Sequence, residues 1–223
     1  MVIAMRVLII LGGRPPSPEL LASQLDWADE VVAADSGIDP LLELGVEPDL
    51  LTGDFDSVRS DLSKLSCRVE HDPSQYATDF EKALSRSSQA GDLHILGACG
   101  GRTDHLLSNL LIAAGIDPRR RVVIFSDREI IHRITPECPL DASPPTDTLL
   151  SLIPFCSCHG VSTAGLKWDL DSAEMGVGAQ LGQSNIVYAD RIEVEIGSGC
   201  MYCILQSENS RCNKHYSLHC QDR

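Results

Sequence analysis

Short apolar runs alternate with helix-like segments from Arg6 to about Ile134, and this alternation limits the possible folds more than any other feature of the chain. Strands that alternate with helices are joined by right-handed crossovers and form a mostly parallel sheet. The fold class predicted for this region is therefore α/β. The expected strands are Val7–Leu11, Val31–Ala34, Asp49–Thr52, Cys67–Glu70, Leu93–Leu96 and Val122–Phe125.

Helix signals lie between these strands. Ser17 is a good N-cap and is followed by Pro18, a residue that favours the first helical position. Thr78 to Glu81 matches the capping box T-x-x-E. The expected helices are Pro18–Ala28, Ile38–Leu44, a segment from Thr78 toward Ser88, and Asp104–Ala114, which carries Leu106, Leu107, Leu110, Leu111 and Ala114 on one face.

The pattern changes after Ile134. The segment Thr135–Thr148 contains four prolines and is typical of a linker. Beyond it the helical period disappears, and strand-like runs separated by turns predict a smaller all-β domain. We therefore expect an α/β domain over 1–134, a linker over 135–148, a β domain over 149–206 and a polar, frayed tail over 207–223. The expected β-domain strands are Leu149–Phe155, Asn185–Ala189, Arg191–Ile196 and Cys200–Gln206.

Charge and composition exclude several classes of protein. The formal net charge of −14 argues against a nucleic-acid partner, because such a partner requires a basic face. The chain has no apolar run of about 18 residues, so we expect no membrane span. Its apolar start lacks a basic n-region and ends at glycines, which favours a buried strand over a secretory signal.

The nine cysteines are odd in number and irregularly spaced in a chain of 223 residues, which argues against a disulfide framework. Cys200 and Cys203 form a C-x-x-C, but the second tight pair of a zinc site is missing. Because the apolar start is interpreted as a strand and not as a secretory signal, we expect a cytoplasmic protein.

Aspartates recur at the ends of expected elements. Asp54 and Asp56 follow a strand in G-D-F-D-S, Asp35 follows V-V-A-A, and Asp79 and Asp104 lie where helices begin. Ligands of parallel sheets bind beyond the carboxyl ends of the strands. Gathered carboxylates repel one another unless a cation lies among them, and Mg²⁺ prefers a few carboxylates plus substrate phosphates. A lone D-x-D is more often a solvated loop, but the shared placement predicts a Mg²⁺-nucleotide enzyme.

Other residues fit phosphate binding. The glycine-rich segment Gly97–Arg102 follows a strand and opens a helix, so its backbone N–H groups can approach an anion. Arg102 offers a guanidinium fork, whereas Lys82 is interpreted equally well as a phosphate ligand or as an exposed lysine beside Glu81. Trp168 can stack on a flat heterocycle or pack in a core.

In this order, the motifs resemble those of the thiamine pyrophosphokinase family, over about Val7 to Leu205. The first domain contributes A-D-S-G at 34–37, P-D-L-L-T-G-D-F-D-S at 48–57, T-D-F-E-K-A-L at 78–84 and G-G-R-T-D-H at 100–105. The second contributes L-S-L-I-P at 150–154, V-S-T-A-G-L-K-W-D-L at 161–170 and Q-S-N at 183–185.

The resemblance implies an α/β nucleotide-binding domain followed by a β-sandwich, in a homodimer whose active sites form between subunits. It implies a transferase that moves the pyrophosphoryl group of ATP to the hydroxyl of thiamine, giving AMP and thiamine diphosphate. Carried over residue by residue, it implies a catalytic Mg²⁺ site at Asp54, Asp56, Asp79 and Asp104, ATP contacts at Asp35, Gln75, Lys82 and Arg102, and a thiamine pocket at Trp168, Ser184 and Asn185.

The sequence departs from the family pattern at Ser36–Asp39, at Gln183 and at Tyr76, where an acidic residue is common. Two alternatives stay open. One is a related Mg²⁺-dependent pyrophosphokinase with another acceptor, for example a hydroxymethylpterin. The other is a non-catalytic protein that binds a nucleotide or thiamine, and the retention of all five aspartates argues against it.

Overall fold

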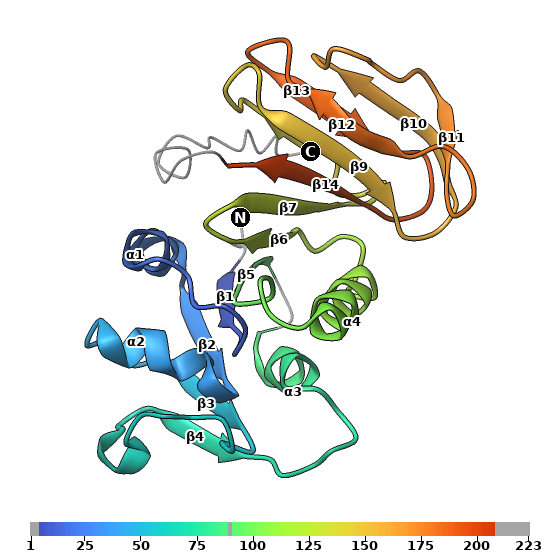
Figure 1. Ribbon diagram of the computed structural model, residues 1–223. Coiled ribbons are helices and arrows are strands. Elements are labelled where there is room, and N and C mark those ends of the chain that lie inside the picture. The colour runs from blue at the N-terminus through green and yellow to red at the C-terminus, as the bar shows by residue number, and fades with distance from the viewer. Residues whose placement is uncertain (1–4, 89–90, 208–223) are drawn as a thin grey trace. The chain divides into compact units, whose positions relative to one another are not determined.

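The structure is a computed structural model that describes residues 5–88 and 91–207 (Figure 1). The chain forms two compact units. Unit 1 comprises the described parts of Met1–Ile112 and Val122–Ser126, and unit 2 those of Ala113–Arg121 and Asp127–Arg223. No helix in the described ranges is both long and apolar enough to cross a membrane. The predicted combination of an α/β domain and a smaller all-β domain is confirmed.

Unit 1 is built on a parallel sheet with the strand order β6-β5-β1-β2-β3-β4. The central strand β1 is apolar and buried from Val7 to Ile10, as a strand covered on both faces requires. The predicted strands are confirmed, with bounds of β1 (Arg6–Ile10), β2 (Glu30–Ala34), β3 (Leu50–Gly53), β4 (Arg68–His71), β5 (Asp92–Leu96) and β6 (Val122–Phe125).

Helices cover both faces of this sheet (Figure 1). The helices α1 (Pro18–Trp27) and α2 (Asp39–Glu43) lie on one face, and α3 (Asp79–Arg86) and α4 (Thr103–Ala114) on the other. The short helix predicted over Ile38–Leu44 begins instead as a 3-10 turn, η1 (Asp35–Ile38), which continues into α2, and a second turn, η2 (Leu62–Lys64), precedes β4.

The predicted apolar face of α4 is only partly buried. Leu110 is buried, but Leu107 and Leu111 keep 52% and 63% of their surface exposed. The predicted capping box of α3 is present, because the Glu81 N–H donates to Thr78 Oγ1 at 3.2 Å and the Thr78 N–H donates to Glu81 Oε2 at 2.8 Å.

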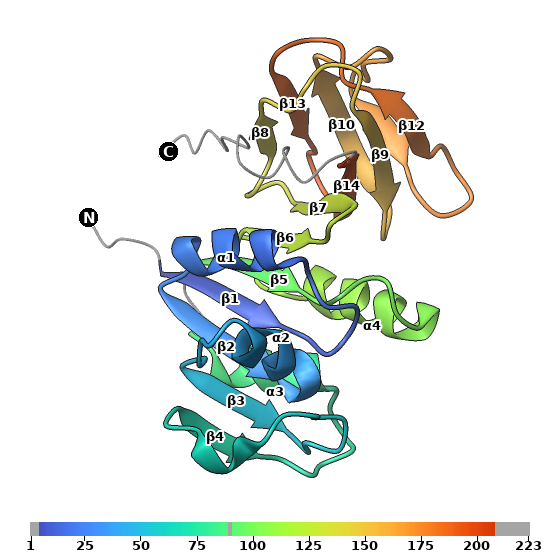
Figure 2. The same ribbon diagram turned by 60° about the vertical axis from the view of Figure 1, so that its left-hand side comes forward.

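Unit 2 is a sandwich of two antiparallel sheets (Figure 2). Cys158 and Val161 of one sheet join Leu150 and Leu152 of the other in one fully buried cluster, which gives the predicted β-sandwich its core. One sheet has the order β12-β9-β14-β7, made of β7 (Glu129–Ile134), β9 (Leu149–Pro154), β12 (Gly182–Ile186) and β14 (Met201–Gln206); the other has the order β11-β10-β13-β8, made of β8 (Leu140–Ala142), β10 (Cys158–Ala164), β11 (Ala173–Met175) and β13 (Ile192–Glu195).

Several sequence predictions for this region are corrected. The stretch expected as a linker contains β8, which pairs with β13 and buries Leu140 and Ala142 in the sandwich core. Strand β7 was not predicted, and its residues, which were expected in the first domain, pair with β14 in unit 2. Strands β10 and β11 were not predicted, and β12 ends at Ile186 rather than continuing to Ala189. The expected tail lies outside the described residues after Ser207.

A buried arginine explains why residues 113–121 group with unit 2. Arg133 on β7 donates hydrogen bonds to the carbonyl oxygens of Ala113 at 3.0 Å, Ile116 at 2.6 Å and Asp117 at 2.8 Å, and also to that of Arg120. These are the carbonyls at and just after the end of α4, where no further helical turn supplies donors. One guanidinium therefore binds the carbonyl groups of the segment Ala113–Arg121 within unit 2.

Candidate active site

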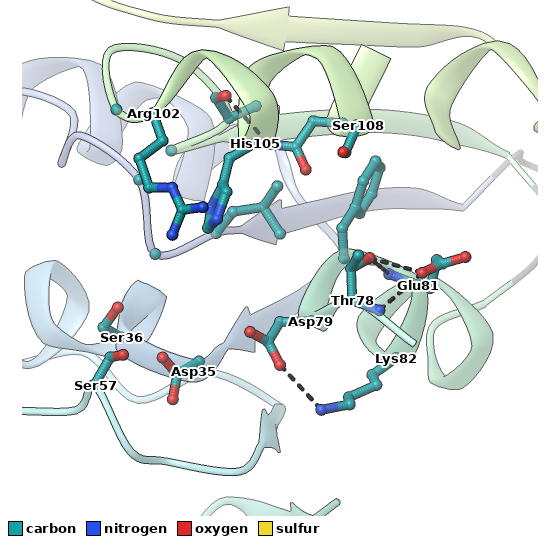
Figure 3. A pocket seen from close by; sticks show the side chains of 18 of the residues that line it. Asp35, Ser36, Ser57, Thr78, Asp79, Glu81, Lys82, Arg102, His105 and Ser108 are labelled. Carbon is teal, nitrogen blue, oxygen red and sulfur yellow. Dashed lines mark hydrogen bonds and ion pairs between the residues drawn. The ribbon is translucent and has the colours of Figure 1, made fainter. Parts of the chain in front are cut away.

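A pocket of about 890 Å³ lies in unit 1, at the edge of the sheet where the parallel strands end (Figure 3). The loops that leave β1, β2, β3 and β5 line it, together with the first turns of α3 and α4. Because the strands are parallel, their carboxyl ends meet at one edge, which is where ligands of such sheets bind. Its volume is typical of a small-molecule site.

Three carboxylates at this edge form a candidate cation site. Oxygen atoms of Asp35, Asp54 and Asp56 lie within 4.8 Å of one another. Asp35 directly follows β2 and has a positive φ of 49°, a conformation that is strained for a residue with a side chain. Only 6% of Asp35 is exposed, and its Oδ1 is buried without a hydrogen-bond partner in the described part of the chain. A bound cation would satisfy this oxygen.

The electrostatics of the carboxylates also fit a cation. Burial raises the pKa of Asp35, with the Ser36 N–H opposing this shift and the charges of Asp79 and Asp54 adding to it. Burial acts to raise the pKa of Asp54 too, but hydrogen bonds outweigh burial and lower it. These bonds come from the Asp56 N–H at 3.4 Å and the Gln75 side chain at 3.1 Å. The group thus holds repelling charges that a divalent ion would offset.

The other two aspartates predicted at the metal have cationic partners instead. Asp79 lines the pocket, and its Oδ1 accepts a hydrogen bond from Lys82 Nζ at 3.2 Å. Lys82 is only 3% exposed, so its interpretation as a free surface lysine is wrong. Asp104 is not among the pocket-lining residues; Arg102 contacts it at 2.6 Å and lowers its pKa. The structure therefore brings Asp54 and Asp56 together, adds Asp35, and leaves Asp104 outside the group.

Glycines let the loops after β1 and β5 approach closely. The Gly13 N–H donates to the Gly97 carbonyl at 3.0 Å, and a Cβ on Gly13 would lie 2.0 Å from that same oxygen. Gly97 has a φ of 69°, and its own Cβ would meet the Leu11 carbonyl oxygen at 2.0 Å. Arg102 and His105 lie across the pocket from Asp35, Ser36 and Ser57 (Figure 3). Any residue with a side chain at Gly13 or Gly97 would force these loops apart.

Sequence reasoning missed part of this lining. Arg14, Ser36, Ser57 and Asn109 all border the pocket, although none of them belongs to the predicted site. The signal for Arg14 was present, because G-G-R directly follows the first strand. The serines and the asparagine carried no such signal, since these residue types are common in any loop.

The residues predicted to bind thiamine lie in unit 2. The Trp168 N–H donates to Asn185 Oδ1 at 3.2 Å, and Asn185 Nδ2 donates to the Trp168 carbonyl at 2.8 Å. Trp168 keeps 55% of its surface exposed, so the interpretation as a core tryptophan is wrong, and Lys167 Nζ lies 4.8 Å from its ring centroid. Ser184 precedes Asn185 with a φ of 60°. The structure thus brings Trp168 and Asn185 together.

Comparison with known families identifies both units. The family model described as thiamin pyrophosphokinase, catalytic domain, matches residues 21–124. The model described as thiamin pyrophosphokinase, vitamin B1 binding domain, matches residues 132–201. The chain belongs to the thiamin pyrophosphokinase family. The catalytic match contains the pocket-lining residues from Asp35 to Asn109, while Leu11 to Arg14 precede it, and the vitamin B1 binding match contains Trp168 and Asn185.

Relatives in this family are distant in sequence. Thiamine pyrophosphokinase 2 of Oryza sativa subsp. japonica is 28% identical over 186 residues, which cover 70% of this chain and 65% of the rice protein. Thiamin pyrophosphokinase 1 of Caenorhabditis elegans is 26% identical over 215 residues, covering 89% of this chain and 88% of the relative. The chain spans only about two-thirds of the plant relatives, 65% of both the rice protein and thiamine pyrophosphokinase 1 of Arabidopsis thaliana.

Solved structures of the family share the fold. Thiamine pyrophosphokinase from Bacillus subtilis superposes with a TM-score of 0.74 at 24% identity, over 91% of this chain and 99% of the other. Thiamin pyrophosphokinase from Candida albicans superposes with a TM-score of 0.77 at 19% identity, over 91% of this chain and 89% of the other. At such identities the superpositions support the fold alone.

Proposed function

We propose that this protein transfers the pyrophosphoryl group of ATP to the hydroxyl of thiamine, giving AMP and thiamine diphosphate. The observation that carries the proposal is the pocket of unit 1, where three carboxylates adjoin glycine-rich loops and cationic side chains in a chain of the thiamin pyrophosphokinase family. Anion-binding loops beside a cation site suit a nucleotide polyphosphate.

The carboxylates fit Mg²⁺. They supply hard oxygen donors, and the buried, unpartnered Oδ1 of Asp35 is an atom that a cation would satisfy. We assign Asp54, Asp56 and Asp35 to this ion; Asp79 and Asp104, which the family resemblance also places at the metal, contact Lys82 and Arg102 instead. When bound, Mg²⁺ offsets negative charge on the phosphate oxygens. Three protein carboxylates leave ligand positions for phosphate and water.

In the reaction the oxygen of the thiamine hydroxyl bonds to the β-phosphorus, the bond between the β-phosphorus and the α,β-bridging oxygen breaks, and AMP leaves with that oxygen. The hydroxyl proton is released. Asp79, whose carboxylate is held by Lys82, orients this hydroxyl by accepting its hydrogen bond. Gln75, Lys82 and Arg102 hold the phosphates. Transfer of this kind depends mainly on positioning and charge stabilisation, so no further base is required.

Thiamine is the acceptor that unit 2 supports best. Trp168 presents an exposed ring, and Asn185 holds the backbone beneath it through two hydrogen bonds. An exposed ring of this kind suits stacking on the aminopyrimidine of thiamine. Ser184 lies beside Asn185 and completes the proposed thiamine contacts.

We further propose that the protein is a homodimer located in the cytoplasm. The dimer is carried over from the family resemblance, and exposed apolar side chains of unit 2 such as Val177 and Tyr188 are available for contact with a second subunit. The seven described cysteines carry free thiols, in keeping with a reducing compartment. Sedimentation analysis checks the dimer: a monomer at the concentrations used for activity would contradict it.

The reaction is tested by incubating the protein with ATP and Mg²⁺ and either thiamine or a hydroxymethylpterin, then separating AMP from ADP by chromatography. We expect AMP in amounts equal to thiamine diphosphate. AMP formed only with the pterin would favour the other acceptor, and ligand binding without AMP would favour a non-catalytic protein.

A further inference from the structure

One cationic side chain of the pocket is left unpaired. Three lysine or arginine side chains line the pocket, and two of them contact aspartates: Lys82 contacts Asp79, and Arg102 contacts Asp104. The third is Arg14, which is exposed and whose guanidinium has no hydrogen bond or ion pair within the described ranges 5–88 and 91–207.

The backbone and the stem of Arg14 are nevertheless held in place. Its N–H donates to the Cys99 carbonyl at 3.2 Å, which joins it to the glycine-rich loop after β5. A Cβ on Gly100 would lie 2.8 Å from Arg14 Cβ and 2.9 Å from Arg14 Cδ. The aliphatic stem of Arg14 therefore lies against Gly100, and the absence of a side chain at Gly100 leaves room for it.

Arg14 also lies on the side of the pocket that complements the carboxylates. Asp35 and Asp54 follow β2 and β3, whereas Arg14 and the glycines follow β1 and β5. One side thus suits a cation and the other suits anionic oxygens. A polyphosphate meets both requirements, since it shares some oxygens with the metal and presents others to cationic donors. A guanidinium offers these oxygens a planar fork of donors.

We propose that Arg14 binds the phosphate chain of the nucleotide substrate. This inference rests on the proposed function, because it takes the ligand of the pocket to be a nucleoside triphosphate with Mg²⁺. It adds a binding residue on the loop after β1, a loop that contributed no residue to the site expected from the sequence. Arg14 should increase the affinity for the phosphate chain and leave the affinity for the nucleoside unchanged.

The test measures binding by calorimetry with the full chain and Mg²⁺, using α,β-methylene-ATP, inorganic tripolyphosphate and adenosine as probes. Arg14→Met should weaken binding of both phosphate-containing probes about 10- to 100-fold, the range expected for a lost hydrogen bond to a charged group, and leave adenosine unchanged. Arg14→Lys keeps the positive charge and should restore an intermediate affinity. Arg119→Met is the matched control, because Arg119 is exposed, is paired with Asp117 and does not line the pocket.

Unchanged affinity of Arg14→Met for tripolyphosphate, relative to Arg119→Met, would overturn the inference and mark Arg14 as a solvated side chain. An equal loss for adenosine would overturn it as well, because the effect would then not depend on phosphate. The Lys variant binding no better than the Met variant would contradict a contribution from charge. If tripolyphosphate binding depends on Arg14 but ATP and thiamine yield no AMP, the inference stands and the proposed reaction fails.

Discussion

The pocket of unit 1 and the Trp168 region of unit 2 are built from different kinds of side chains. The pocket gathers charged groups on loops at the ends of parallel strands, and one of them, Asp35, is strained, buried and lacks a partner for its Oδ1. The Trp168 region presents one exposed aromatic ring on backbone that Asn185 holds through two neutral hydrogen bonds. The strained, buried carboxylate in unit 1 destabilises the folded protein until a ligand binds, whereas the hydrogen bonds between Asn185 and the Trp168 backbone are complete without a ligand.

This difference predicts separate roles for the two units. In the proposed reaction, charged groups of unit 1 bind the metal and the phosphates, and the exposed ring of Trp168 in unit 2 binds the acceptor. Changes in unit 1 should then act on turnover and on affinity for MgATP, and changes in unit 2 on affinity for thiamine.

The largest effect is expected for Asp54→Ala. Losing a carboxylate of the cation site should lower kcat by about 10²–10³-fold or more with little change in the unfolding temperature, because Asp54 is a loop residue outside the core. Steady-state AMP formation and circular dichroism measure the two quantities. Asp26→Ala, on the exposed side of α1, serves as the charge-matched control.

Asp104→Ala tests which aspartates belong to the cation site. The Asp104 carboxylate pairs with Arg102 and is not one of the three grouped carboxylates. Asp104→Ala should therefore lower kcat less than Asp54→Ala does. Equal losses for the two variants would show that Asp104 joins the metal in the working enzyme.

The next largest effect is expected for Trp168→Ala. Removing the exposed ring should raise KM for thiamine about 10-fold, the order of one stacking contact, and leave KM for ATP near its original value. Initial rates measured with each substrate varied in turn separate the two constants. A rise in KM for ATP alone would break the proposed division between the units.

A stability gain is expected for Asp35→Asn. The raised pKa of Asp35 means that the folded protein resists its ionisation, so the unfavourable contribution appears as pH rises through that pKa. The amide should stabilise the metal-free protein at pH 7 by on the order of 1 kcal/mol, while activity is lost. Thermal unfolding in a chelator measures the gain.

This gain should vanish below about pH 4, where the carboxyl group is protonated in both the folded and the unfolded chain. A variant that is less stable than the original protein at pH 7 would show that the Asp35 charge is not strained by its surroundings.

The smallest effect is expected for Thr78→Ala. Loss of the capping box should destabilise α3 by about 1 kcal/mol and loosen Asp79 and Lys82, which lie in its first turn. Chemical denaturation followed by circular dichroism should show the change. Thr78→Ser keeps the cap and should behave as the original protein does.

Much of unit 1 could be predicted because its signals are local. The strand at Leu50–Gly53 and the aspartates after it are adjacent in the sequence, and the Thr78 capping box lies within four residues. The topology of parallel strands then brings distant loops to one edge, which is how Asp35 and Asp54 were expected together.

The remainder depends on contacts between segments far apart in the sequence. The segment Thr135–Thr148 was interpreted as a linker because it contains four prolines, and only the pairing of Leu140–Ala142 with β13 makes part of it a strand. The pairing of Arg102 with Asp104, and the lack of a partner for the Arg14 guanidinium among the described residues, follow from side-chain positions that no spacing encodes. For the same reason the sequence placed Lys82 equally well in the pocket and on the surface.

The central claim is tested most directly by following the label of γ-³²P-ATP in the presence of Mg²⁺ and thiamine. Transfer of the whole pyrophosphoryl group puts the label in thiamine diphosphate and leaves unlabelled AMP in equal amount, and this is the result that we predict. Labelled thiamine monophosphate together with ADP, or label that stays in ATP, would contradict the account.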